Sequence, residues 1–146
     1  MLVMSPWDQP TPITRSWCLW EIFSAMEALA GIEVVIPTSQ RARLKDAITR
    51  DFNAVLAAIM GIDARAAQSF KAEDRDSIVQ AIAGSVGFDV LNNRVRDHLR
   101  DRYVEACIRI GEEEVAGGRA DASTAHLFNQ IGIVARSFGQ HGLAIE

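Results

Sequence analysis

Two short apolar runs flank a strongly apolar helical segment at the start of the chain, and this pattern restricts the possible folds more than any other feature. The first run covers residues 2–4 and is stopped by Ser5-Pro6. The second covers residues 32–36, is β-branched at four of its five positions and is stopped by Pro37. Both predict buried strands. A strand, a helical crossover and a second strand predict a parallel βαβ unit, so the fold class is α/β at this end of the chain.

A sheet of only two strands is marginal in water. The pattern therefore leaves two alternatives open: further strands come from a partner chain, or the unit is a piece of a larger domain. In both cases we expect the apolar residues of the two runs to be covered by chain outside this segment.

The helix between the strands is predicted over residues 16–30, with Ser16 as its N-cap and Gly31 just after its end. Large apolar side chains surround most of this helix and leave a narrow polar stripe: Glu21, Ser24 and Glu27. A helix of this composition must be covered on more than one side. We therefore expect Trp17 and Trp20 in the core.

The chain after residue 37 is predicted to be helical throughout, so the α/β part passes into an all-α part. The expected helices cover residues 38–49, 51–61, 73–83, 88–116 and 125–138, with a helical turn at 63–70. Asp51 is the expected N-cap of the second of these helices. The longest one has an apolar residue at every fourth position: Leu91, Val95, Leu99, Tyr103 and Cys107. Three successive glutamates at 112–114 oppose the helix dipole near its C-terminal end and predict fraying there.

The charge balance argues against a nucleic-acid partner. The chain has 15 basic and 19 acidic side chains and a formal charge of −4, whereas a nucleic-acid-binding domain carries a clustered basic excess. The most apolar stretch, residues 17–37, is interrupted by three glutamates, so it does not predict a membrane span. Neither a nucleic acid nor a membrane is therefore an expected partner.

The residue types that hold metals or activate nucleophiles are scattered along the chain. His98, His126 and His141 have no second histidine or cysteine three or four positions away, so their spacing predicts no metal site. No glycine-rich phosphate-binding loop is present, and no cofactor is expected. Cys18 and Cys107 lie far apart and are predicted to be buried small hydrophobic residues, which favours a reduced, cytoplasmic setting.

The run S-W-C-L-W-E at residues 16–21, after the strand at 2–4, carries a resemblance to a known family. It resembles the central part of Toll/interleukin-receptor-type (TIR) domains, in which a buried strand ending in a serine leads to a helix that opens with S-x-W-C-x-x-E. In this chain the serine directly precedes the tryptophan, and a proline-rich loop separates strand and helix. The resemblance covers residues 1–37 and is closer to TIR-like domains fused to tetratricopeptide repeats in large kinesin-light-chain-like proteins.

This resemblance implies two possible roles for Glu21. In TIR domains that hydrolyse NAD, the glutamate of this motif is the catalytic acid. That chemistry also needs the nucleotide-binding loop and the first strand of the domain, and neither is in this sequence. Many TIR-type domains are instead scaffolds that self-associate and have no activity, in which case Glu21 is an ordinary surface acid.

A second resemblance lies at the C-terminal end. The residues that sit where a tetratricopeptide repeat (TPR) has its tryptophan, leucine, glycine, loop glycine and second-helix alanine are Phe128, Ile131, Gly132, Gly139 and Ala144. The resemblance implies an incomplete TPR helical hairpin, in which Gly132 lets two helices approach closely. Because one repeat cannot bury its own face, about three or more repeats are needed for a stable array.

Three parts are therefore predicted: a partial TIR-like βαβ unit at 1–37, a helical connector at 38–118 and the start of a TPR-like repeat at 119–146. The predicted function is that of a non-enzymatic protein–protein interaction or scaffold protein, which binds protein or peptide partners and can self-associate. Two alternatives remain: an NAD hydrolase that uses Glu21, and a truncated fragment without independent activity.

Five residues are the expected contacts for a protein partner: Trp7, Trp20, Phe128, Gly132 and Ala144. Trp7 lies in a loop with three prolines, which makes it the better candidate for an exposed contact, because exposed tryptophans often contribute strongly to binding.

Overall fold

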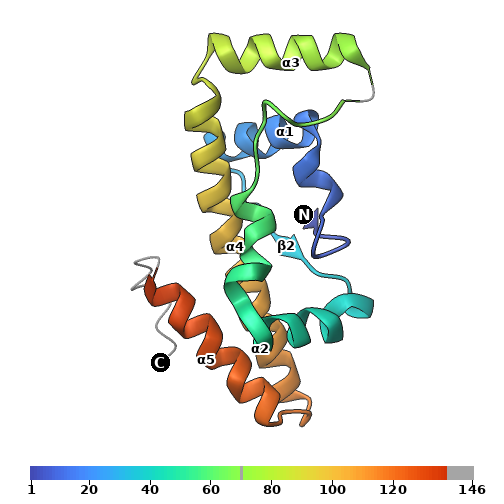
Figure 1. Cartoon of the computed structure of the whole chain (residues 1–146), viewed down its shortest axis with the longest axis vertical. Helices are drawn as coiled ribbons and strands as arrows, with labels where there is room; N and C mark the ends of the chain where they lie inside the picture. The colour runs from blue at the N-terminus through green and yellow to red at the C-terminus, as the bar shows by residue number, and fades with distance from the viewer. Residues whose placement is uncertain (70, 138–146) are drawn as a thin grey trace.

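The computed structural model describes residues 1–69 and 71–137 and is mainly helical, with one small parallel sheet (Figure 1). In chain order its elements are β1 (Leu2–Val3), the 3-10 helix η1 (Thr11–Thr14), α1 (Ser16–Glu27), β2 (Val34–Val35), α2 (Thr38–Met60), α3 (Ala72–Gly84), α4 (Phe88–Ala116) and α5 (Ala122–Ser137). The prediction of a mainly helical chain with a short parallel strand pair is confirmed at this level. The helical turn expected at 63–70 is a hydrogen-bonded turn without a helix, and residue 70 lies outside the described residues.

The sheet consists of β1 and β2, which pair in parallel with Leu2 opposite Val34. The N–H of Leu2 donates to the carbonyl of Glu33 at 2.7 Å, and the N–H of Met4 donates to that of Val35 at 2.9 Å. Since alternate residues of a strand point their backbone groups to opposite sides, the N–H and C=O of Val3 face away from β2. Both strands are shorter than the runs that predict them.

The outer edge of β2 is closed by a side chain from α4. Arg109 donates from Nη2 to the carbonyl of Val34 at 2.9 Å and pairs through Nη1 with Glu33 at 3.5 Å. A backbone carbonyl that another strand would otherwise bind is thereby occupied.

The prediction of Ser16 as the N-cap of α1 is wrong. Arg15 precedes the helix and Ser16 is its first residue, without a side-chain capping bond. The Ser16 hydroxyl is buried and lies 2.9 Å from Ser69 Oγ and 3.3 Å from the carbonyl of Gln68, which pairs with Arg15 in an isolated bridge. This long-range contact takes the hydroxyl away from the capping position.

The C-terminal end of α1 places a leucine in an unusual conformation. The N–H of Ala30 donates to the carbonyl of Ala25 at 2.9 Å and that of Leu29 to Met26 at 3.1 Å, the bond pattern of a Schellman motif. Leu29 has a φ of 55° at the position that glycine usually takes, and its side chain is 93% exposed. The conformation is therefore strained and no described packing compensates for it.

Helix α2 has two limbs, residues 38–50 and 52–60, that meet at Asp51 in a bend visible in Figure 1. Asp51 has a non-helical backbone, with φ −162° and ψ 100°. Its Oδ1 accepts from the N–H groups of Asn53 at 3.0 Å and Ala54 at 3.3 Å, so it caps the second limb. The prediction of two helices separated by an Asp51 cap is confirmed.

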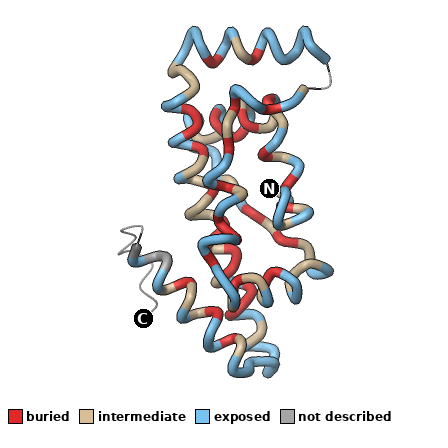
Figure 2. The backbone as a smooth tube through the Cα atoms, viewed as in Figure 1, coloured by how far each residue is buried: buried red, intermediate tan, exposed pale blue. Residues whose placement is uncertain are grey.

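The core lies along α4, whose bounds are those predicted for it. The five apolar residues that recur at every fourth position of α4 are all buried. Helix α4 contacts α1, α2 and β2, and Figure 2 shows how buried positions recur along the backbone. Helix α3 is exposed along most of its length and buries Ile78 and Ile82. It covers one end of the core and adds little to it.

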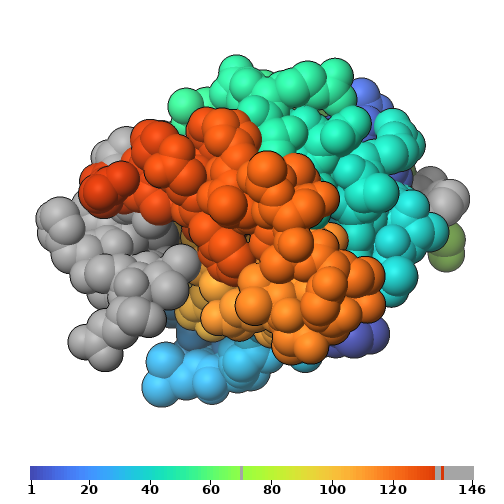
Figure 3. Space-filling model, turned by 90° about the horizontal axis from the view of Figure 1, so that it is seen from below, coloured from blue at the N-terminus to red at the C-terminus, as the bar shows by residue number. Residues whose placement is uncertain are grey.

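Helix α5 lies across α2 and the C-terminal part of α4, as the view from below shows (Figure 3). Asp121 Oδ1 accepts from the N–H of Thr124 at 2.9 Å, which caps the start of the helix. Leu127 and Ile131, on the inner face of α5, are buried. Gly111 of α4 provides the space for this contact, because a Cβ there would lie 3.0 Å from Leu127 Cδ2.

Candidate functional site

Glu21, the candidate catalytic residue, is exposed on α1 and is held by a neighbouring tryptophan. Trp17 Nε1 donates to Glu21 Oε1 at 2.8 Å, from one turn earlier on the same helix. The prediction that Trp17 lies in the core is wrong, since its side chain is 52% exposed. Trp17 lies on the same outward helix face as Glu21, and the four-residue spacing between them is the signal that predicts this.

Trp20 and Trp7 are both half-buried. The Trp20 ring stacks on Phe23 with centroids 5.9 Å apart. Part of the ring surface that is predicted to contact a protein partner is therefore buried in the core. The backbone N–H of Trp7 donates to Gln40 Oε1 at 2.8 Å, and Gln40 Nε2 donates to Ser5 Oγ at 2.8 Å. Trp7 is therefore attached to the first limb of α2 instead of projecting freely from its loop.

The contact residues expected from the TPR resemblance are only partly described. Phe128 is half-buried beside Gly111 of α4. A Cβ on Gly132 would meet no described atom within 4 Å. Gly139 and Ala144 lie outside the described residues, as does the helix that Gly132 is expected to approach. The described glycine that does allow a close helix contact is Gly111, and its position inside a long helix is the signal for it.

A concave site lies in the bend of α2 and is called the α2 groove here. It has a volume of about 570 Å³ and three walls: the first limb, the second limb and the loop at Trp7-Asp8. The second limb contributes three alanines, at positions 54, 57 and 58. The spacing of residues within α2 does not predict this site, because Trp7 is brought to it from far away in the sequence.

Besides the capping carboxylate of Asp51, four charged side chains border the α2 groove: Asp8, Arg43, Asp46 and Arg50. None of the four forms an ion pair within residues 1–69 and 71–137. The Arg50 Nε donates to the backbone carbonyl of Asp46 at 3.2 Å, which orients its guanidinium along the limb. The neighbouring Arg41, by contrast, pairs with Glu113 of α4 at 2.5 Å. The groove thus combines an apolar wall with charges of both signs that are free to bind a ligand.

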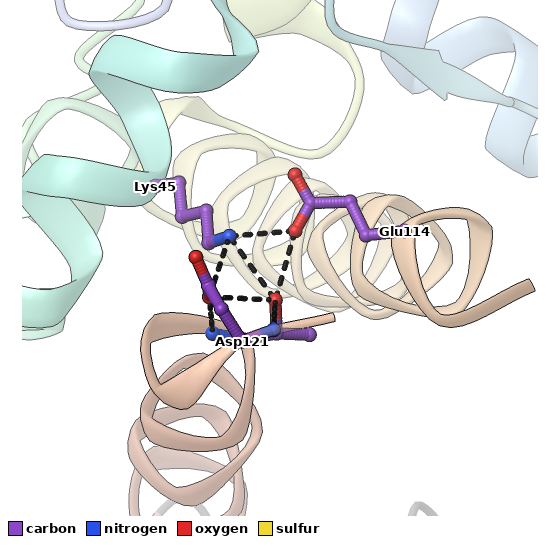
Figure 4. A network of polar contacts seen from close by, with 4 residues as sticks. Lys45, Glu114 and Asp121 are labelled. Carbon is purple, nitrogen blue, oxygen red and sulfur yellow. Dashed lines mark hydrogen bonds and ion pairs between the residues drawn. The ribbon is translucent and has the colours of Figure 1, made fainter. Parts of the chain in front are cut away.

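The side of the first limb that faces α4 and α5 carries a polar network instead (Figure 4). Lys45 Nζ lies 2.7 Å from Glu114 Oε2, 3.1 Å from Thr124 Oγ1 and 3.4 Å from Asp121 Oδ1. Partial burial alone lowers the pKa of the Lys45 ammonium, but the hydrogen bond and charge of Glu114, together with Asp121, raise it above its usual value. Lys45 is therefore a structural cation that joins three helices.

This network also engages residues 112–114, where the helix dipole predicts fraying. Helix α4 continues to Ala116, and Glu113 and Glu114 are paired with Arg41 and Lys45 of α2. Cationic partners from another helix offset the unfavourable dipole at this end.

The two cysteine thiols and the possible metal ligands of the described residues complete the survey of the chemistry-bearing side chains. Burial raises the pKa of the half-buried Cys18 thiol and, more strongly, that of the buried Cys107 thiol, so both disfavour the reactive thiolate. Within the described ranges, no three residues of His, Cys, Asp and Glu come together as a set of metal ligands. No helix in the same part of the chain is long and apolar enough to cross a membrane.

Comparisons with protein families, with curated proteins and with solved structures give no match. Only the residues and the geometry of this chain therefore bear on its function.

Proposed function

We propose that this chain is a non-enzymatic protein–protein interaction or scaffold protein and that it binds a peptide segment of its partner in the α2 groove. The observation that carries the proposal is the groove itself, with an apolar wall of three alanines and four charges that form no ion pair in the described part of the chain. Its volume of about 570 Å³ falls in the range of about 300–1,000 Å³ typical of ligand sites.

The TIR-like and TPR-like assignments belong to this proposal. The S-W-C-L-W-E run and the parallel pairing of Leu2–Val3 with Val34–Val35 support a partial TIR-like unit at 1–37. The repeat-like residues from Phe128 onward support the start of a TPR-like repeat at 119–146. In such an arrangement the connector at 38–118 forms the peptide site together with the loop at Trp7-Asp8, and the TIR-like part self-associates.

Selection of short random peptides on the immobilised protein tests the proposal. Ala54 and Ala57 are exposed on the second limb, so A54W and A57W fill the groove without disturbing the core. We expect selected peptides to bind the wild-type protein and to lose most of their affinity for both variants. The matched control is A81W, at an exposed alanine of α3, which leaves binding unchanged. Peptides that bind A54W and A57W as well as the wild type contradict the proposal.

The NAD-hydrolase alternative is tested directly by incubating the protein with NAD. Glu21 is exposed, its carboxylate is bound by the Trp17 indole, and the α2 groove is lined by other residues. We therefore expect no release of nicotinamide. Release that disappears in E21A would replace the present proposal by an enzymatic one.

A further inference from the structure

We infer that the occupant of the α2 groove is an amphipathic helix of a partner protein, with an acidic, a basic and a second acidic side chain along the face that meets the first limb of α2. This inference rests on the proposed function and deepens it by naming the chemistry of the partner. It depends on three properties of the groove: its two helical walls, the charge order of the first limb and the small side chains of the second limb.

The walls of the groove favour a helical occupant over an extended one. Two of the three walls are helical limbs, whose backbone groups bond within the helix. In the third wall, the N–H of Trp7 already donates to Gln40. An extended peptide bound here would find few backbone partners on the two helical walls, whereas a helix brings its own N–H and C=O groups already satisfied.

The first limb presents charges in a fixed order. Arg43, Asp46 and Arg50 line the groove at positions i, i+3 and i+7, so they share one helix face and span about 10 Å. A helix that lies antiparallel to this limb matches them with an acid at its position j, a base at j+4 and an acid at j+7. Opposite charges at these places attract, and a partner with the reversed order is repelled at every contact.

The small side chains of the second limb require large side chains from the occupant. Ala54, Ala57 and Ala58 fill little of the corner themselves, so the partner has to supply large aliphatic side chains that pack on them and on Trp7. A second copy of this chain does not meet that need, because its own α2 face is recessed in the same corner. A protruding helix of a different protein fits the shape.

Two synthetic helical peptides test the inference. Both have the same leucines, but one carries the order acid–base–acid and the other the order base–acid–base. We expect the wild-type protein to bind the acid–base–acid peptide about tenfold more tightly at low salt, and less selectively at high salt. The charge-reversed protein R43E/D46K/R50E, altered at three exposed positions, should prefer the other peptide. Circular dichroism and a thermal melt establish that this variant folds.

The outcomes separate this inference from the function on which it rests. Equal affinities of the two peptides for the wild-type and charge-reversed proteins overturn the charge order. Selection from the random library of peptides that contain proline and bind in extended form overturns the helical occupant but leaves peptide binding in the groove intact. If none of the selected peptides loses affinity for A54W, both the helical occupant and the proposed peptide binding in the groove are overturned.

Discussion

Gly111 of α4 lies so close to Phe128 of α5 that a Cβ on the glycine would stand 2.6 Å from Phe128 Cζ. Atoms that are not bonded do not approach each other so closely, so either the ring or the helix would have to move. The docking of α5 against α4 thus depends on the absence of one side chain near the C-terminal end of a 29-residue helix.

The first prediction concerns this pair. G111A should lower the free energy of unfolding by about 1 kcal/mol, because the clash outweighs the better helix propensity of alanine. In an F128A background the same substitution should raise it, by up to about 1 kcal/mol, since the ring is gone. Denaturant unfolding of the four proteins measures this cycle. Equal effects of G111A in both backgrounds would show that the two residues do not interact.

The strained Leu29 gives the second prediction. L29G should stabilise the protein by about 1 kcal/mol, because glycine adopts a φ of 55° without a steric penalty and the exposed leucine loses no packing. L29A keeps a Cβ and is the matched control, with a change close to zero. Thermal melts of the three proteins compare them. A lower melting temperature for L29G than for L29A would be inconsistent with backbone strain at this position.

Tyr103 leads to the third prediction. Its side chain is 1% exposed, and its hydroxyl has no hydrogen-bond partner among the described residues. Burial accordingly raises the pKa of the phenol far above its usual value. Y103F should raise the free energy of unfolding by about 1 kcal/mol, because it removes an unsatisfied polar group and keeps the ring. Y103A should lower it by about 3–5 kcal/mol. A loss of stability in Y103F would reveal a partner for the hydroxyl.

The fourth prediction tests the network around Lys45. The chain has two lysines, and the other, Lys71, is exposed, so K45M and K71M form a matched pair. K45M leaves Glu114 without its cation and should lower the free energy of unfolding by about 1–2 kcal/mol. K71M should change it by less than about 0.5 kcal/mol. Hydrogen exchange should also show weaker protection of α5 in K45M alone. Similar exchange in both variants would mean that the network does not hold α5.

The fifth prediction concerns acid. The Asp63 carboxylate accepts from the N–H of Arg65 at 3.0 Å and from Asn92 Nδ2 at 2.9 Å, and these bonds lower its pKa below the usual 3.8. A lowered folded pKa stabilises the protein above pH 3.8, and this contribution is lost as the pH falls through the folded value. The melting temperature of D63N should therefore fall less between neutral and acidic pH than that of the wild type. The control D76N, at an exposed position of α3, should follow the wild type.

Local patterns predict much of this fold. The apolar residues four positions apart predict the long helix α4, because a buried stripe of that period needs no information from elsewhere in the chain. The same holds for the bend at Asp51, where a capping carboxylate acts on N–H groups two and three residues later. Trp17 is a different case, since its hydrophobicity suggests burial whereas its position on the helix places it beside Glu21.

Contacts between distant segments are what the sequence does not predict. The Ser16 hydroxyl binds a partner 53 positions away. This contact takes Ser16 out of the N-cap position that the local sequence pattern predicts for it. The α2 groove exists because the backbone of Trp7 is bound by Gln40, 33 positions later. Neither contact leaves a periodic or compositional trace. The residues that best predict such contacts are those that destabilise their own secondary structure, such as Gly111 inside a helix.

Arg109 also limits how many chains the small sheet can join. Growth into a long assembly by strand pairing requires that each copy both receives and offers a free strand edge. Arg109 already binds the Val34 carbonyl on the β2 edge, so an incoming strand has to displace it there, whereas no such contact is needed at Val3 of β1. Two copies that pair through β1 use up that edge in both. Strand pairing through β1 would therefore end at a dimer and would not propagate into a filament.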